Sequence, residues 1–284
     1  MNILTFDIED WFHLLENRST RGEEDWGAFK SRLPETLGRI LDLLEEMSVK
    51  GTFFVLGWIA RKHPDLVRQI SAHGHEVASH SDLHQLVYEQ GPQSFQKDVE
   101  RSVGTLEEIV GKKVRAFRAP GFSITPRVPW AFDILADAGI EIDCSIFPAR
   151  RAHGGFPDFG ASEPVLIEAG GRAIKEFPMN TARLLGYPFI FSGGGYFRLF
   201  PYGMLRYLMN ESNYVMTYFH PRDFDPEQPV VPSLGPYRRF KSYYGLRRAF
   251  PKLKRLLADF PFVSLYQAEA LIPWHEARQV RLAG

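Results

Sequence analysis

The sequence predicts an α/β fold, and three observations support that class. Short apolar runs alternate with segments of helical period along most of the chain, which is the pattern of strands joined by crossover helices. Such crossovers make successive strands parallel. The 284 residues are 44% hydrophobic, which is enough for one large α/β barrel or for two ordinary domains.

The first half of the chain contains the clearest strand and helix signals. Apolar runs bounded by polar residues, Gly or Pro predict strands at 2–8, 51–57, 75–79, 113–119 and 140–146. Apolar residues spaced three or four apart predict helices at 34–47, 64–74, 95–110 and 129–139. Pro34 falls near the start of the first helix, where proline is favoured. This order predicts successive βα units.

The pattern changes after Pro148. Residues 163–179 predict a hairpin that turns at Gly170 and Gly171. Since no linker composition separates residues 149–200, we interpret them as an insertion over one face of a single domain. The regular order then resumes, with helices expected near 203–211 and 247–258 and strands at 214–220 and 262–266.

Composition excludes several classes of protein. The 34 basic and 34 acidic residues balance, which argues against a nucleic-acid or other general polyanion binder. The single cysteine, Cys144, excludes an internal disulfide and a cysteine-rich zinc site, so a metal would need His and carboxylate ligands. No run of 18 apolar residues occurs and the start lacks the basic region of a signal peptide. We therefore expect a cytoplasmic protein without a transmembrane segment.

Polar side chains that could carry chemistry gather at the ends of the predicted strands. In parallel α/β folds the functional groups lie at the carboxyl ends of strands, so these side chains are expected to share one rim. His80 and His84 are four residues apart, a spacing that predicts both imidazoles on one face of a helical turn. The candidates are Asp7, Glu9, Asp10, His80, His84, Arg118, Asp143 and His220.

Five short motifs resemble, in order, those of the NodB-type polysaccharide deacetylases, carbohydrate esterase family 4. They read TFDIED, HSDLH, RAFRAP, IDCS and YFHPRD, and the resemblance covers roughly residues 2–225. The second and third motifs are specific, whereas the fourth is weak. Longer stretches such as FDIEDWFH and HSDLHQLVY look like deacetylases of polysaccharide- and exosortase-associated gene clusters, related to the allantoinase-like and Helicobacter-type peptidoglycan deacetylase branch.

The resemblance implies a fold, an activity and site residues. The fold would be a distorted (β/α) barrel with about seven strands. The activity would be removal of acetyl groups from N-acetylated sugars with one divalent metal, usually zinc and sometimes cobalt or nickel. By the same resemblance Asp7 is the general base, His220 the general acid, and His80 and His84 are metal ligands, while Arg118 keeps Asp7 ionised and aligned.

The sequence leaves two carboxylates as candidates for the third metal ligand. The family usually has adjacent aspartates, the first as base and the second as ligand, whereas this chain reads Asp7-Ile8-Glu9-Asp10. Strand alternation places Asp7 and Glu9 on one face. Asp10 follows the strand and could reach back from the turn, which favours it slightly.

Other residues have weaker assignments. Asp143 could orient His220 or be a buried structural residue. A backbone N–H after Pro120, at Gly121 or Phe122, could stabilise the oxyanion. The run Gly193–Gly195 lacks the Lys-Ser/Thr of a phosphate-binding loop and predicts a plain loop, a lid or a subsite loop. His13 is expected to be structural.

The segment 238–255 contains eight basic residues and no acidic one. It is interpreted as a solvated helix face, or as a site for substrate phosphates or an anionic membrane surface.

Two other functions compete with sugar deacetylation. One is an allantoinase-like amidohydrolase that acts on a small cyclic amide. The other is a catalytically silent sugar-binding module, which would require loss of the base or of a metal ligand.

Overall fold

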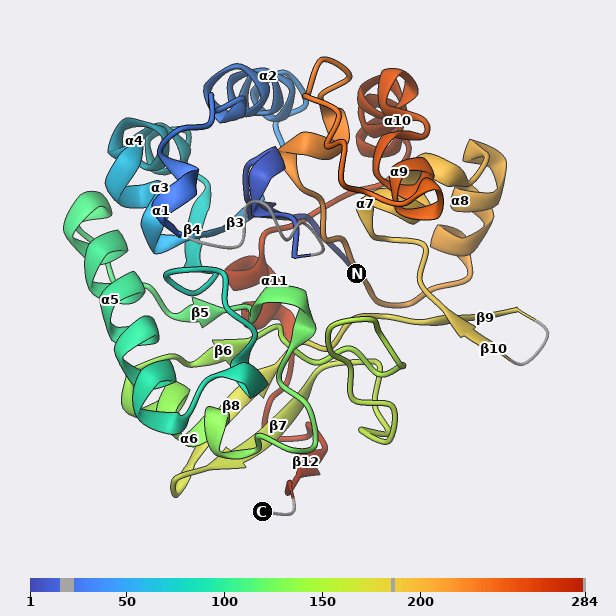
Figure 1. The fold of residues 1–284 in the computed structure, drawn as a ribbon. Helices are drawn as coiled ribbons and strands as arrows, with labels where there is room; N and C mark the ends of the chain where they lie inside the picture. Colours follow the sequence, from blue (N-terminus) through green and yellow to red (C-terminus); the bar gives the residue numbers. More distant parts are fainter. Residues whose placement is uncertain (16–22, 185–186, 283–284) are drawn as a thin grey trace.

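The protein is described by a computed structural model that places residues 1–15, 23–184 and 187–282 (Figure 1). Its main sheet has the strand order β12-β7-β8-β6-β5-β4-β3-β2. Strands β2 to β6 are parallel to their neighbours, and β8 is parallel to β6 but antiparallel to β7. The strands are β2 (Thr5–Ile8), β3 (Thr52–Val55), β4 (Glu76–Ser79), β5 (Ala116–Phe117), β6 (Ile142–Asp143), β7 (Val165–Ala169), β8 (Arg172–Glu176) and β12 (Gln279–Val280).

Helices flank these strands on both sides (Figure 1). The helices are α1 (Glu23–Trp26), α2 (Leu33–Glu46), α3 (Gly57–Lys62), α4 (Pro64–Ala72), α5 (Pro92–Val110), α6 (Trp130–Asp137), α7 (Gly194–Leu199), α8 (Tyr202–Asn210), α9 (Pro236–Tyr243), α10 (Leu246–Asp259) and α11 (Leu265–Leu271). The predicted α/β class with parallel strands is confirmed. None of the helices in the described ranges is long and apolar enough to cross a membrane.

The first and last motifs meet beside β2. Strand β1 (Asn2–Ile3) pairs in parallel with β11 (Val215–Met216), and the Asp7 N–H donates to the Phe219 carbonyl over 2.7 Å. The segment before His220 therefore lies next to β2, on the side opposite β3. Among the described residues, hydrogen-bonded strands do not close into a complete barrel.

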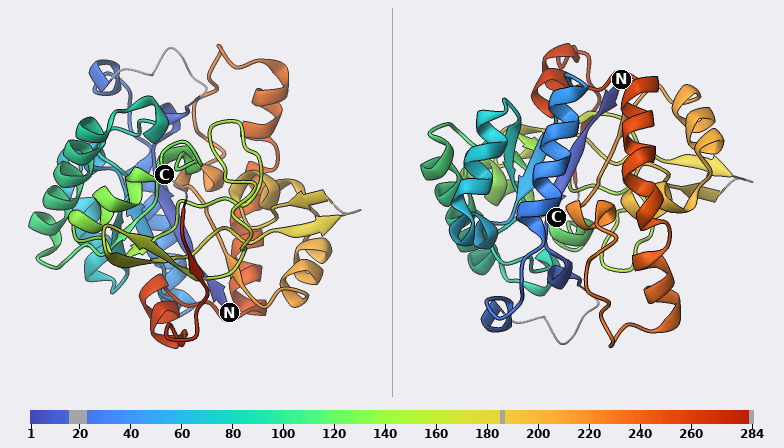
Figure 2. Two further views of the ribbon diagram at one scale, coloured as in Figure 1. Left: turned by 90° about the horizontal axis from the view of Figure 1, so that it is seen from below. Right: turned by 90° about the horizontal axis from the view of Figure 1, so that it is seen from above.

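The apolar stripe of α2 explains how the segment next to β2 is held in place. Leu37, Ile40 and Leu44 are fully buried in the main core. The helix packs against η5 (Pro221–Phe224), the turn that follows His220. Figure 2 shows α2 and α10 standing side by side over this edge, and Lys254 of α10 pairs with Glu46 of α2 at 2.7 Å. Burial of the stripe thus fixes the backbone that carries His220.

Two of the elements that differ from the sequence prediction have a clear local cause. The predicted strand 262–266 is wrong: only Val263 bridges to Ile3, and α11 begins at Leu265. Ser264 causes this early start, because its side chain and that of Gln267 form a capping box. Helix α3 was not predicted, since its six residues are too few to establish a helical period.

The segment 149–200 only partly covers the site. The predicted hairpin is confirmed as β7 and β8, turning at Gly170 and Gly171. Because β8 pairs with β6, this hairpin extends the sheet rather than lying over its end. A second hairpin, β9 (Ala182–Leu184) and β10 (Tyr187–Phe189), projects from the molecule (Figure 1).

Candidate active site

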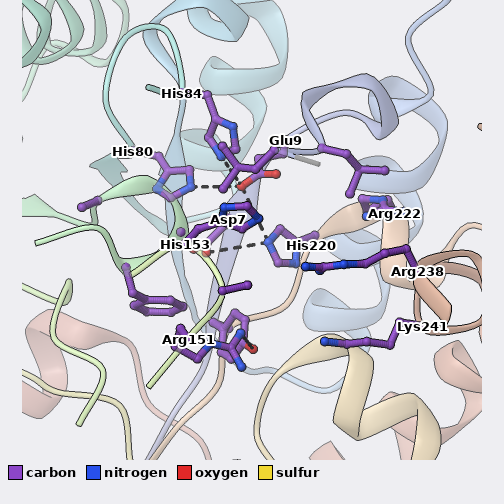
Figure 3. Close-up of a pocket in the computed structure, with 17 residues that line it drawn as sticks. Asp7, Glu9, His80, His84, Arg151, His153, His220, Arg222, Arg238 and Lys241 are labelled. Atoms are coloured by element: carbon purple, nitrogen blue, oxygen red, sulfur yellow. Dashed lines mark hydrogen bonds and ion pairs between the residues drawn. The ribbon is translucent and has the colours of Figure 1, made fainter. Parts of the chain in front are cut away.

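A pocket of about 220 Å³ opens at the carboxyl ends of β2, β4 and β5 (Figure 3). It brings together side chains from the first, second and fifth motifs. Residues of the segment 149–200 and of α9 complete its wall. The lining residues are Asp7, Glu9, Leu14, Leu15, His80, His84, Ala119, Gly121, Phe122, Arg151, Ala152, His153, Tyr218, His220, Arg222, Arg238 and Lys241.

Glu9, His80 and His84 form a group that could hold a metal ion. Glu9 Oε1 lies 3.1 Å from His80 Nε2 and 2.9 Å from His84 Nε2, and all three side chains are buried. His80 Nδ1 contacts the Arg118 carbonyl at 2.7 Å, which leaves Nε2 to serve as the ligand atom. Two imidazoles and one carboxylate are a donor set of catalytic zinc sites, so these residues fit a divalent metal.

The electrostatics of this group favour an ionised carboxylate. Burial alone would raise the pKa of Glu9, but His84 and His220 nearby and hydrogen bonds from both ligand imidazoles hold that pKa well below its usual range. An ionised carboxylate facing two imidazole nitrogens is the state that a metal ligand requires.

The two histidines lie on a tight loop, and the predicted helical turn is wrong. Ser81 and His84 have positive φ angles of 70° and 54°, which a helix does not contain. The loop is held by Asp98 of α5, whose carboxylate accepts the N–H groups of Asp82 and Leu83 at 2.9 and 3.1 Å. The loop geometry, rather than a helical period, brings the imidazoles together.

The structure does not place Asp10 among these ligands, which corrects the slight preference for it. Its carboxylate accepts the N–H of Trp11 at 2.8 Å and that of Arg32 at 3.1 Å. The chain turns into η1 (Trp11–His13) directly after Glu9, and Asp10 caps that turn. Burial raises the pKa of Asp10. His13 accepts the Asp10 N–H through Nδ1 at 2.9 Å and lies in an aromatic cluster with Trp26 and Trp58.

Asp7 is paired with Arg118 at the floor of the pocket. Arg118 Nη1 lies 2.6 Å from Asp7 Oδ1 and 2.8 Å from Thr5 Oγ1, and the arginine is fully buried. The guanidinium also lies 4.1 Å from the ring centre of Phe54. The other carboxylate oxygen, Asp7 Oδ2, is 4.0 Å from His220 Nε2. Arg118 therefore places a positive charge directly beside the buried Asp7 carboxylate.

His220 is held by Asp223, not by the predicted Asp143. Asp223 Oδ2 lies 3.2 Å from His220 Nδ1 and accepts the His220 backbone N–H at 2.9 Å. Asp143 instead accepts the N–H and hydroxyl of Ser145 at 2.8 and 2.7 Å, because its strand end faces that backbone. The spacing of three residues in HPRD was the available signal for Asp223, since it places a carboxylate one turn from the histidine.

The pH dependence of stability should report on His220. Burial alone would lower the pKa of His220, but Glu9, Asp223 and Asp7 raise it to about 9 from 6.5. The protonated form then stabilises the fold fully below pH 6.5, and this contribution is lost as the pH rises through 9. We expect the unfolding free energy of the metal-free protein to fall over this range, measured by urea unfolding. The His220→Gln variant should give a flatter curve, and equal slopes would contradict these contacts.

Gly193 and Gly194 are closely packed, so the structure does not support a lid at this run. Gly193 bridges to Tyr218, and Gly194 opens α7. A Cβ at Gly194 would overlap the Asp223 carboxylate, whereas a Cβ at Gly195 would meet nothing within 4 Å. These glycines allow α7 to approach the residue that holds His220.

We expect Gly194→Ala to displace Asp223 and to destabilise the protein by about 1–3 kcal/mol. Activity per folded molecule should also decrease, because His220 loses its partner. Gly195→Ala is the matched control and should leave both quantities unchanged within about 0.5 kcal/mol. Thermal unfolding and initial rates check both variants. Normal stability and rate in the Gly194→Ala protein would refute the packing argument.

The segment that was predicted to offer an oxyanion donor borders the pocket as η4 (Pro120–Phe122). Gly121 and Phe122 line the pocket, whereas Pro120 does not. The Phe122 N–H donates to the Ala119 carbonyl at 3.1 Å. Of the two amides after the proline, that of Gly121 is therefore the candidate donor to a substrate oxygen.

Sequence reasoning missed several pocket residues. Arg151 and His153 lie in a segment without a motif, and no pattern marks them. Arg222 lies within the motif YFHPRD, two residues after His220, which was predicted. Tyr218 is 8% exposed and lies two residues before His220. Strand alternation could therefore have placed both side chains on one face.

Comparisons with known proteins relate parts of this chain to polysaccharide deacetylases. Residues 4–142 match a family model described as polysaccharide deacetylase, and residues 144–269 match one described as a domain of unknown function, DUF3473. A chitooligosaccharide deacetylase from Sinorhizobium fredii is 37% identical over 109 residues, 36% of this chain and 46% of the relative. A peptidoglycan-N-acetylglucosamine deacetylase from Bacillus cereus is 29% identical over 108 residues, 38% of this chain and 49% of the relative. The chain thus spans about half the length of these relatives.

Two solved structures are similar in fold. A candidate polysaccharide deacetylase from Mycobacterium smegmatis aligns with a TM-score of 0.67 at 17% identity, covering 100% of this chain and 93% of the other. A family 4 carbohydrate esterase from Streptomyces lividans, in complex with acetate, aligns with a TM-score of 0.50 at 14% identity, covering 99% and 97%. At these identities the likeness concerns the fold alone.

Proposed function

We propose that this chain, which contains a polysaccharide deacetylase domain in its first half, is a metal-dependent hydrolase that removes the N-acetyl group from a sugar. One observation carries the proposal. The group Glu9, His80 and His84 lies beside the Asp7–Arg118 pair and beside His220 in a single pocket (Figure 3). A metal site, a base and an acid are the three components that amide hydrolysis needs.

Glu9, His80 and His84 would hold the metal, with zinc as the first choice because of the donor set. Cobalt and nickel accept the same nitrogen and oxygen ligands. When bound, such an ion lowers the pKa of a water molecule and polarises a carbonyl group.

Asp7 is the proposed general base. Its Oδ1 is bonded to Arg118, so Oδ2 is the oxygen available to take a proton from the attacking water. The bond to Arg118 fixes the orientation of the Asp7 carboxylate. The N–H of Gly121 would donate to the carbonyl oxygen as negative charge develops there.

His220 is the proposed general acid. Its Nε2 faces the pocket, 4.0 Å from Asp7 Oδ2, while Asp223 holds Nδ1. With Nδ1 fixed, Nε2 is the atom that would deliver a proton to the departing amine. Glu9 and Asp223 favour the protonated imidazolium that this step requires.

We propose that both matched segments belong to one domain. Ile142 of β6 pairs with Lys175 of β8, and Phe6 bridges to Phe219, so the two segments are joined by strand pairing. The cytoplasmic location and a contact of residues 238–255 with a membrane surface stay predictions.

Acetate release tests the function directly. The metal-reconstituted protein should release acetate from chito-oligomers or from sugar phosphates that contain N-acetylglucosamine. Activity on a small cyclic amide with none on N-acetyl sugars would favour the allantoinase-like alternative. Bound metal with no hydrolysis of any amide would favour a sugar-binding module.

A further inference from the structure

Several basic side chains line the wall of the pocket. Among the described residues the lining carboxylates are Asp7 and Glu9, and both are engaged: Asp7 pairs with Arg118, and Glu9 faces the two imidazoles. Around them stand the side chains of Arg151, Arg222, Arg238 and Lys241 (Figure 3). The contacts of Arg151 and Arg222 show what the wall can bind.

Arg151 and Arg222 are held in place by neutral partners. Arg151 Nη2 donates to the Tyr218 hydroxyl at 3.1 Å. Arg222 donates to Gln228 Oε1 from Nε at 3.3 Å and from Nη2 at 3.2 Å. Across the described part of the chain, neither arginine forms an ion pair with a carboxylate. Neutral partners fix both guanidinium groups without neutralising their charge.

Most other anchored arginines of this protein are paired with acids. Arg32 lies 2.9 Å from Asp225, and Arg115 lies 2.7 Å from Glu141. Within the described ranges, Arg151 and Arg222 thus differ from these two arginines in that their hydrogen-bond partners are neutral. Two half-buried guanidinium groups on a pocket wall are suited to an anion, because each offers a planar fork of donors to a phosphate or carboxylate.

Helix α9 adds basic side chains from the segment 238–255. Arg238 and Lys241, three residues apart on one helix face, line the pocket, and both extend from α9 toward His220 in Figure 3. Arg239 lies between them in the sequence but is exposed and does not line the pocket. Lys254, further along the segment, pairs with Glu46. The basic segment therefore contributes two of its side chains to the pocket.

We infer that the substrate is an N-acetylated sugar that carries an anionic group, a phosphate or a carboxylate, close to the acetamido group. This inference rests on the proposed deacetylase function and names the substrate class of the same pocket. A phosphate would come from a sugar linked to a nucleotide or lipid carrier, and a carboxylate from an N-acetylated uronic acid. A neutral chito-oligomer has no charged group that could pair with Arg151 and Arg222.

Binding without turnover tests the inference separately from the activity. Calorimetry on the metal-loaded full chain would compare N-acetylglucosamine, N-acetylglucosamine 1-phosphate and N-acetylglucosaminuronic acid. We expect at least one anionic ligand to bind about tenfold more tightly than the neutral sugar, the effect of one charge-assisted hydrogen bond. This preference should shrink with added salt. Which anion binds better identifies the source of the charge.

Single substitutions locate the effect. Arg151→Gln and Arg222→Gln should each reduce the ratio of anionic to neutral affinity about tenfold. Arg239→Gln removes the same charge from the exposed side of α9 and should keep the wild-type ratio. If no ligand releases acetate but the anionic preference holds, the proposed reaction fails and the anion site stands.

Three results would overturn the inference. Equal affinity for the neutral and both anionic sugars is the first. The second is a loss of preference in Arg239→Gln as large as in Arg222→Gln, which would indicate general charge rather than a site. The third is binding to phosphatidylserine vesicles combined with no preference among the sugars, which would assign the basic wall to a membrane surface.

Discussion

Glu9→Gln is expected to lose metal and activity together, whereas Asp10→Asn should keep both. The Glu9 carboxylate lies about 3 Å from both ligand imidazoles, so a neutral amide removes the charge that a divalent ion needs. Loss of supporting groups alone costs about 10- to 100-fold in metal affinity, and loss of a ligand should cost at least 100-fold. Elemental analysis after dialysis, paired with acetate release, measures both effects.

Asp10→Asn is the matched control, because it removes the neighbouring carboxylate charge. Its expected defect is in stability, about 1 kcal/mol, since an amide NH2 cannot accept the Arg32 N–H that Asp10 Oδ2 accepts at 3.1 Å. His80→Ala should behave as Glu9→Gln does. Metal retained in Glu9→Gln but lost in Asp10→Asn would return the ligand role to Asp10.

Asp7→Asn is expected to keep the metal and to lower kcat by about 10²- to 10⁴-fold, the range for removal of a general base. The amide cannot accept the proton of the attacking water. Metal content should stay near the wild-type value, because Asp7 lies outside the ligand group. Steady-state kinetics and elemental analysis of the same sample check the two statements.

The unfolding free energy of the Asp7→Asn variant must be measured together with its kcat. Arg118 is fully buried, and removal of the charge opposite a buried ion can cost about 3–5 kcal/mol. Thr5→Val is the matched control, since it removes the other oxygen that Arg118 contacts at 2.8 Å and leaves the carboxylate. A folded Asp7→Asn protein with wild-type kcat would exclude Asp7 as the base. An equal loss of kcat in Thr5→Val would indicate a role in positioning only.

The sequence located the site, because strand ends are readable from local patterns. Apolar runs mark where β2 and β4 end, and parallel pairing then places Asp7 and His80 at one rim. The sequence pattern did not distinguish Glu9 from Asp10 as the carboxylate ligand of the metal. It depends on the turn at η1, whose cap engages one carboxylate and leaves the other facing the imidazoles.

Other misses have similar physical causes. Asp143 does not reach His220, because the end of its own strand faces another way. Only the packed sheet defines that direction. Arg151 reaches the pocket from an irregular segment, where neither period nor motif carries information. The strand predicted at 262–266 failed because a capping box outweighed β propensity.

The bond between the Asp7 N–H and the Phe219 carbonyl has a consequence for the order in which the site matures. Residues 9, 80 and 84 are all near the beginning of the chain, whereas His220 joins through contacts that span 212 positions, such as that between Thr5 and Thr217. Chains are synthesised from the N-terminus, and contacts of long separation form late. The nascent chain therefore contains all three ligand residues well before it contains the acid, and a chain that ends before residue 215 would have every ligand residue but would lack His220.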